Sequence, residues 1–184
     1  MQTSYVVIGL VVLVALFFVA QYNKLIRLNV TVDEAFGQIE VQLQRRADLI
    51  PNLVETVKGY ASHERNTLDS VTEARSKTTS AHGLNEVAAA DNMMTSALRG
   101  LLAISESYPD LKASENFRAL QEELASTENK IGFARQYYND NVSSLNQSIT
   151  TIPGKFFAGP ANVKARDFYV VDDPTKRDVP KVQF

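Results

Sequence analysis

Charged residues and a proline interrupt an apolar stretch near the middle of the first half of the chain. The stretch is RRADLIPNLV, residues 45–54, and Glu64 follows it directly after His63. Charges at such places could do acid–base chemistry, bind an anion or a metal ion, or pair with one another inside the fold. His63-Glu64 would open the H-E-x-x-H motif of zinc proteases. Position 67 is a threonine, so the second histidine ligand is missing.

Other signs of enzyme chemistry are also missing from the sequence. The chain has no cysteine, which excludes disulfides, zinc–thiolate sites, cysteine nucleophiles and lipoprotein acylation. It has no P-loop, no G-x-S-x-G, no S-x-x-K and no Glu-x-x-His pair of a di-iron bundle. The net charge of −2 provides no field for holding nucleic acid. We therefore expect no enzyme activity, no metal, no cofactor and no nucleic-acid partner.

The N-terminal segment reads as a membrane anchor. Residues 1–23 carry no charged side chain, and residues 5–20 are apolar or glycine throughout. A helix needs roughly 17–25 residues to cross the hydrocarbon core, and Tyr5 and Tyr22 are placed as interfacial anchors. A cleaved signal peptide fits less well, because there is no basic region before the apolar run and Phe18 would occupy the −3 position. We predict an uncleaved transmembrane anchor over 1–23.

The flanks of the anchor predict its orientation. Only four uncharged residues precede the apolar run, whereas Lys24 and Arg27 follow it directly. Segments that carry lysine and arginine next to a membrane helix stay on the cytoplasmic side. The chain is therefore expected to cross the membrane once, with its N-terminus outside, its body in the cytoplasm, and membrane lipid as a partner.

Apolar residues recur at helical spacing after the anchor. They predict a first soluble helix to about Leu49 that can continue the anchor, and Pro51 is expected to end or kink it. Three more helices are expected, at about 52–79, 86–106 and 115–149. The last has the most regular stripe, with steps of three and four residues. Such stripes pack between long antiparallel helices, so we predict an all-α fold with an antiparallel four-helix bundle over 24–150.

The C-terminal tail, residues 151–184, contains four of the six prolines and cannot form a long helix. Its aromatic residues favour a segment that packs on the bundle or on a neighbouring molecule. DFYVV, which starts at residue 167, could form a short strand.

Several charged residues fall on or beside the apolar stripes. An unpaired buried charge costs several kcal/mol, and the arginine guanidinium can bind a carboxylate through two hydrogen bonds. We therefore interpret these residues as an internal clasp, a set of ion pairs that holds helices in register. Two alternatives are a surface site near Glu64 and Glu128 that binds an anion or does acid–base work, and a docking patch for a partner. The candidates are Arg45 or Arg46, Asp48, Glu64, Arg75, Glu128 and Arg135.

Four segments of the chain have a recognisable pattern. They are YNKLIRL (22–28), QLQRRADLIPNLVETVKGYASHE (42–64), VTEAR (71–75) and ENFRALQEELASTENKIGFARQYYNDNV (115–142). With the apolar N-terminal helix they resemble the bacterial LemA family over nearly the whole chain. Departures from the family pattern are Leu145-Asn146 and Ile152-Pro153, at the end of the fourth helix.

The resemblance implies a single-pass protein of the bacterial inner membrane with a long antiparallel helical body, and it implies no reaction. Members of the family are often encoded near membrane proteases or other membrane proteins, which are therefore candidate partners. The family's motif positions fall here on a set that we assign to the clasp or docking patch. The set is Arg45, Arg46, Asp48, Pro51, Asn52, Glu64, Arg75, Glu115, Asn116, Glu128, Asn129, Arg135, Tyr138 and Asn139.

These observations lead to one functional hypothesis and two alternatives. We expect a membrane-anchored helical scaffold or adaptor that acts by binding proteins, including copies of itself, since confinement to a membrane raises the effective concentration. The first alternative is a protein that organises or remodels the membrane. The second is an enzyme with an unrecognised site near Glu64 and Glu128.

Overall fold

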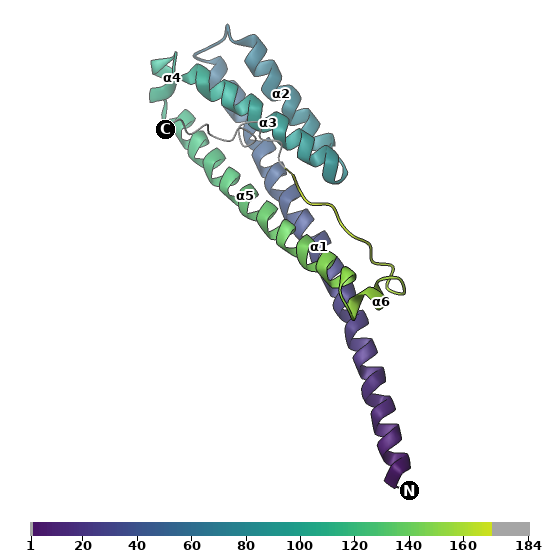
Figure 1. Cartoon of the computed structure of the whole chain (residues 1–184). Coiled ribbons are helices and arrows are strands. Elements are labelled where there is room, and N and C mark those ends of the chain that lie inside the picture. Colours follow the sequence, from purple (N-terminus) through teal and green to yellow (C-terminus); the bar gives the residue numbers. More distant parts are fainter. Residues whose placement is uncertain (1, 171–184) are drawn as a thin grey trace, which may run out of the picture. The chain divides into compact units, whose positions relative to one another are not determined.

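A computed structural model describes residues 2–170, without the side chains of residues 3 and 4. This part of the chain is helical and contains no strand, which confirms the all-α class (Figure 1). The strand considered from residue 167 onward is not formed over 167–170, and the rest of the tail lies outside the described residues. The helices are α1 (Gln2–Lys58), α2 (Arg65–Ser80), α3 (Gly83–Ser105), α4 (Pro109–Ala113), α5 (Glu115–Thr150) and α6 (Gly154–Ala158).

The chain divides into two compact units, which are described separately below. The anchor unit contains Met1–Ile39 and Phe133–Phe168, and the body unit contains Glu40–Gly132 and Tyr169–Phe184. The domain boundaries drawn from the sequence, and the single four-helix bundle over 24–150, stay predictions.

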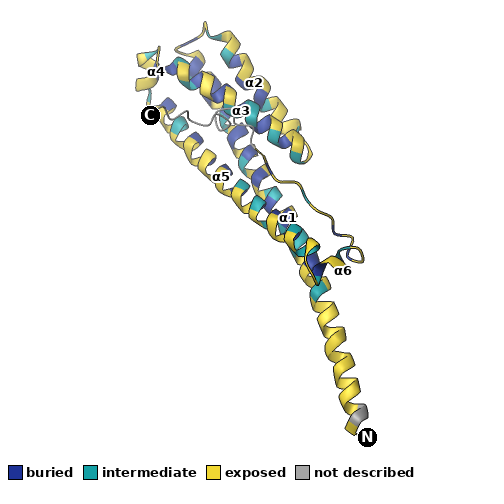
Figure 2. Ribbon diagram, viewed as in Figure 1, coloured by how far each residue is buried: buried dark blue, intermediate teal, exposed yellow. Residues whose placement is uncertain are grey.

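The body unit is built around one cluster of buried apolar side chains (Figure 2). Five helices contribute to it, with Ile50 from α1, Val71 from α2, Met94 from α3, Leu111 from α4 and Phe117 from α5. Each of these side chains is buried, and burial of a large apolar side chain contributes about 1.5–3 kcal/mol. The apolar spacing along each helix therefore explains why these segments pack together.

The turn between α2 and α3 is shorter than the sequence suggested. A connection over 80–85 was expected, but only Ala81 and His82 separate the two helices. Gly83, the first residue of α3, has a φ of +77°, which residues with a Cβ rarely adopt. A glycine at this place lets the chain reverse within a short turn.

The predicted end of the helix at Pro51 is wrong, whereas the alternative, a kink at Pro51, stays a prediction. Pro51 lies inside α1, which continues to Lys58, and α2 begins only at Arg65. The helix predicted over 52–79 is therefore divided between the end of α1 and α2, with the turn at 59–64. The helices predicted over 86–106 and 115–149 match α3 and α5 to within three residues.

The anchor unit begins with an apolar helical segment whose side chains are exposed. Residues 5–20 are exposed along their whole length, and burial in α1 becomes regular only from Leu25 onward (Figure 2). Among the described residues, α1 is the helix long and apolar enough to cross a membrane, with a mean hydropathy of 2.4 in its most apolar window. Leu25, Val32 and Ile39 then form a buried stripe on the same helix.

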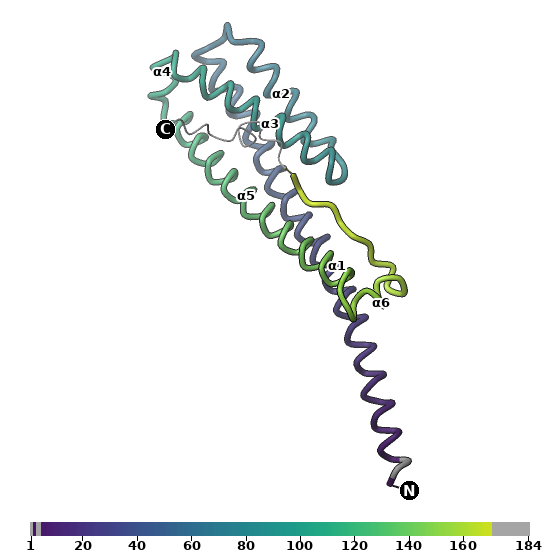
Figure 3. The backbone as a smooth tube through the Cα atoms, viewed as in Figure 1, coloured from purple at the N-terminus to yellow at the C-terminus, as the bar shows by residue number. Residues whose placement is uncertain are grey.

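The segment after α6 runs back along the anchor unit (Figure 3). Arg166 fastens it: its Nη2 donates to Asp33 Oδ1 at 2.8 Å and to Asn29 Oδ1 at 3.1 Å, both on α1. Its backbone pairs with the Asn146 side chain through two hydrogen bonds of 2.9 Å. The part of the tail up to Phe168 therefore lies against α1 and α5 without any regular structure.

Candidate functional site

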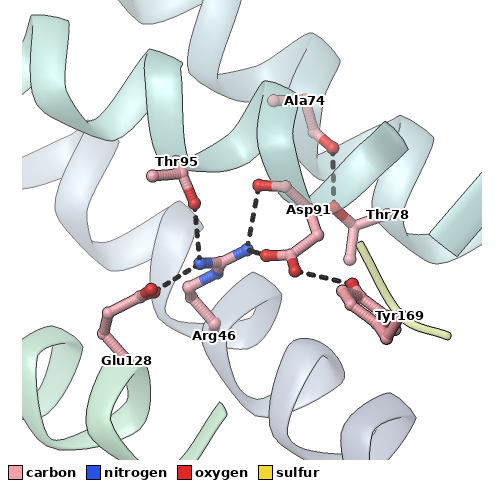
Figure 4. Close-up of polar contacts among 7 residues, drawn as sticks. All are labelled: Arg46, Ala74, Thr78, Asp91, Thr95, Glu128 and Tyr169. Atoms are coloured by element: carbon pink, nitrogen blue, oxygen red, sulfur yellow. Dashed lines mark hydrogen bonds and ion pairs between the residues drawn. The ribbon is translucent and has the colours of Figure 1, made fainter. Parts of the chain in front are cut away.

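Arg46 is the centre of a buried polar cluster in the body unit (Figure 4). Its side chain is 1% exposed, although it is among the largest in the core. Nη2 donates to Asp91 Oδ1 at 2.6 Å, and Nη1 donates to Glu128 Oε2 at 2.7 Å and to Thr95 Oγ1 at 3.3 Å. Three helices, α1, α3 and α5, are thereby joined by one guanidinium group.

The second member of the cluster, Asp91, is 0% exposed and carries a second strong contact. Its Oδ2 accepts a hydrogen bond of 2.6 Å from the hydroxyl of Tyr169, which is also buried. Glu128 lies at the edge, with 47% of its side chain exposed. A cation between two carboxylates, one of which is also bound by a tyrosine, is suited to holding the fold rather than to exchanging protons.

The apolar stripes explain how these residues come to the interior. Arg46 takes one place in the stripe Ile39, Leu43, Arg46, Ile50 of α1. Asp91 was missed by the sequence analysis, although it occupies the place of an apolar residue between Val87 and Met94 of α3. This position in the apolar stripe is the sequence feature that could have identified Asp91 as buried. Tyr169 is one of the aromatic residues for which packing of the tail was expected, but no periodicity in its irregular segment indicated Asp91 as its partner.

Arg75 explains why α1 continues through Pro51. A proline has no N–H, so the carbonyl four residues earlier loses its helical hydrogen bond. That carbonyl belongs to Ala47, a fully buried residue. Arg75 Nε, from α2, donates to Ala47 O at 3.1 Å and supplies the missing donor. The guanidinium of Arg75 therefore replaces the hydrogen bond that Pro51 cannot make. Pro51 itself is exposed.

Glu64 lies in the turn before α2 and pairs with a residue that the sequence analysis did not select. Its Oε1 accepts a hydrogen bond of 3.1 Å from the hydroxyl of Tyr108. This hydrogen bond raises the pKa of Tyr108, with smaller contributions from burial and from the negative charge of Glu64. Glu64 is half-buried, so it lies at the end of the core rather than inside it.

The Tyr108–Glu64 contact predicts a pH effect. Since the folded-state pKa of Tyr108 lies above its ordinary value of 10.0, the contact stabilises the fold fully below that pH and is lost as the pH rises through the folded pKa. The melting temperature of the wild type should therefore fall more steeply above pH ~10 than that of Tyr108→Phe. Circular dichroism melts at a series of pH values measure this, and Glu64→Gln should flatten the curve likewise. Equal slopes in all three proteins would contradict it.

Several predicted residues lie on the surface of the body unit. Arg45 contacts Glu123 at 3.5 Å, with both side chains about half exposed, and Asp48 accepts a hydrogen bond of 2.7 Å from Gln44. Asn52 and Asn116 line one open groove. The remaining exposed positions of the predicted set are Glu115 and Asn129.

Three further residues of the set lie in the anchor unit. Tyr138 is buried, its hydroxyl donates to Asp167 O at 3.0 Å, and its ring lies 5.8 Å from that of Phe36. Burial raises the pKa of Tyr138, against a lowering effect of Arg166. Arg135 and Asn139 are half-buried on the same stretch of α5. The predicted set is therefore distributed over several places, and of its members the structure brings Arg46 and Glu128 together. Its role as a clasp stays a prediction.

No group of residues in the described part of the chain has the composition of a metal site. The profile of the LemA family matches residues 35–184, which is most of the chain. The chain belongs to the LemA family. The match starts after the apolar segment and includes the whole body unit, so the buried Arg46 cluster lies within the region shared with the family.

Individual relatives agree with this assignment. Protein LemA of Metamycoplasma hominis is 27% identical over 135 residues, which cover 73% of this chain and 62% of the relative. Magnetosome protein MamQ 2 of Paramagnetospirillum magneticum is 22% identical over 175 residues, and MamQ of Magnetospirillum gryphiswaldense is 21% identical over 175 residues. Both alignments cover 81% of this chain and 64% of the relative. The chain thus spans less than two thirds of the length of these relatives.

The family and the fold together indicate a membrane-associated helical protein. Neither the family description nor the names of the relatives is the name of an enzyme. The apolar start of α1 is compatible with attachment to a membrane, in agreement with the anchor expected from the sequence.

Proposed function

We propose that this LemA-family chain is a membrane-anchored helical scaffold or adaptor that acts by binding proteins, including copies of itself. The observation that carries the proposal is the start of α1. Residues 5–20 form an uncharged helical segment that is exposed throughout, and the same helix continues into the buried stripe from Leu25 onward. In water such a segment would be a large exposed apolar surface, whereas in a bilayer it is covered.

The proposed orientation places the N-terminus outside and the body in the cytoplasm of a bacterial cell, with a single crossing of the inner membrane. Lys24 and Arg27 follow the apolar segment and favour the cytoplasmic side for the body. Within the anchor unit Arg166 fastens the tail to α1, and within the body unit the Arg46 cluster joins three helices, so each unit by itself presents a fixed surface. A fixed surface is what a binding protein requires, because little ordering entropy is then lost on association.

The surface offers candidate contact residues for such binding. Phe133 and Tyr137 are exposed one helical turn apart on α5, and Val41 is exposed on α1. Single exposed apolar residues are normal, but a pair four residues apart lies on one helix face. Phe133, with 72% of its surface exposed, is therefore a suitable position for a crosslinking probe.

Crosslinking in the native membrane tests the proposal. The full-length protein carries a photoreactive phenylalanine analogue at Phe133, is irradiated in cells, and its adducts are identified by mass spectrometry. We expect ladders of the protein itself or one dominant foreign membrane protein. Unirradiated cells and irradiated detergent extracts are the controls, since dissolving the membrane removes lateral confinement.

Each result has a distinct meaning. Ladders of the chain support a self-assembling scaffold, and one dominant foreign membrane protein, such as a membrane protease, supports an adaptor. Adducts with lipid alone contradict both roles and favour the membrane-organising alternative, which shape changes of liposomes carrying the pure protein would then measure. The absence of adducts from this position and from a second probe at Val41 would overturn the scaffold proposal.

A further inference from the structure

The short helix α6 lies against the apolar segment of α1. The ring of Phe157 packs edge-on against the ring of Phe18, with centroids 5.2 Å apart. Phe18 belongs to the uncharged stretch 5–20, three residues before Gln21. Phe157 is thereby buried, although Phe18 keeps about half of its surface exposed. Part of the anchor unit thus reaches back to the segment that we assign to the membrane.

Gly154 holds α6 at this position. A Cβ atom at residue 154 would collide with the backbone carbonyl oxygen of Ser148, and its next neighbour would be Leu25 at 3.8 Å. The first residue of α6 is therefore packed against the last turns of α5 and against α1, which only a glycine permits. The placement of Phe157 beside Phe18 is a consequence of this close approach.

The same segment exposes two large apolar side chains. Ile152 is 75% exposed and Phe156 is 70% exposed, on either side of the buried Gly154. Lys155 between them is exposed and positively charged. Large apolar side chains with a neighbouring lysine, next to a segment that enters the hydrocarbon, are the composition of an interfacial membrane contact.

We propose that residues 151–158 are a second membrane contact, in which Ile152 and Phe156 enter the boundary between lipid headgroups and acyl chains and Lys155 reaches the headgroups. The proposal rests on the membrane anchor proposed above. At ~1.5 Å per residue, Phe18 lies two residues, or about 3 Å, inside the end of the apolar segment at Ala20. A contact at Phe18 therefore places the neighbours of Phe157 at the interface, where amphipathic elements are buried by about 5–10 Å.

A second membrane contact would fix the rotation of the anchor helix about its own axis. A single apolar helix can rotate about its own axis in a bilayer, since lipid surrounds it evenly. Attachment of α6 at one side of α1 fixes that rotation, because turning the helix would pull Ile152 and Phe156 out of the lipid. The same side of α1 would then always be available to partners in the membrane, because α6 lies against the other side.

Tryptophan fluorescence tests the second contact, because the chain contains no tryptophan. Single variants Phe156→Trp, Phe133→Trp and Phe18→Trp of the full chain are reconstituted in vesicles of phosphatidylcholine and phosphatidylglycerol, with and without brominated acyl chains. Phe133 is matched to Phe156 in residue type and exposure, but it lies 17 residues before the end of α5, about 25 Å along the helix.

We expect Phe156→Trp to emit at shorter wavelength and to lose intensity in brominated vesicles, as Phe18→Trp does, whereas Phe133→Trp is unaffected. Quenching of Phe18→Trp without quenching of Phe156→Trp would overturn the second contact and leave the anchor intact. If Phe18→Trp is not quenched either, the anchor itself fails. Quenching of all three, Phe133→Trp included, would show that lipid contact is not specific to α6 and would also overturn the proposal.

Discussion

Replacing Arg46 with methionine is expected to lower the free energy of unfolding of the body unit by about 3–5 kcal/mol. The substitution keeps an apolar stem of similar length and removes the cation between Asp91 and Glu128. Glu128 is half exposed and can be solvated, but Asp91 is fully buried and would keep a charge whose closest cation has gone. The penalty for burying that carboxylate without the guanidinium, rather than the lost attraction, sets the size of the effect.

Urea unfolding of the full chain in detergent, followed by circular dichroism, measures this loss. Arg45→Met is the matched control: Arg45 is the preceding residue, and its partner Glu123 lies 3.5 Å away with both side chains about half exposed. Surface pairs of this kind contribute about 0–1 kcal/mol, so the control should change little. Similar losses for the two variants would contradict a clasp centred on Arg46.

A double substitution tests whether the stability lost in Arg46→Met comes from the charge left buried on Asp91. Replacing both Arg46 and Asp91 by apolar residues removes the ion pair without leaving either charge, so most of the stability lost in Arg46→Met should return. If the double variant is no more stable than Arg46→Met, the loss comes from the missing hydrogen bonds of the cluster, including that of the buried Tyr169 hydroxyl to Asp91, rather than from a buried charge. Recovery would show that the ion pair adds little net stability to the fold.

Regular spacing of apolar residues in the sequence predicts the long helices of this protein and the residues on their buried faces. The apolar spacing of α5 places its boundaries within a residue of those observed, and the uncharged run at 5–20 is the exposed part of α1. Arg46 was a candidate for burial because it occupies a place in a regular stripe. Asp91 could have been selected by the same reasoning, since it takes an apolar position between Val87 and Met94.

Other features depend on contacts between distant residues, which periodicity does not reveal. The donor that replaces the missing N–H of Pro51 comes from Arg75, 28 residues from Ala47 in the sequence. Local rules predicted that Pro51 ends or kinks the helix, and the predicted end is wrong because a tertiary contact compensates for the lost hydrogen bond. Tyr169 reaches Asp91 from an irregular segment whose path no spacing rule describes.

Loss of the Arg75 side chain is expected to lower the free energy of unfolding by about 1–3 kcal/mol, the second largest effect. In Arg75→Met the Ala47 carbonyl, in a fully buried residue, has neither the helical N–H nor the guanidinium donor. An unsatisfied buried acceptor costs this amount, whereas truncation of an exposed cation does not. Lys77→Met, two residues away on α2 at an exposed position, is the matched control and should change little.

The two residues should also depend on each other. Pro51→Ala restores an N–H that can bond to Ala47 O within α1, so Arg75→Met in that background should cost less than about 1 kcal/mol. Urea unfolding of the wild type, both single variants and the double variant gives the coupling energy, which we expect at about 1–2 kcal/mol. Additive losses would mean that Arg75 stabilises the fold through packing alone. A clear coupling would answer why a proline is tolerated inside this helix: the arginine of a neighbouring helix satisfies the carbonyl that the proline leaves without a partner.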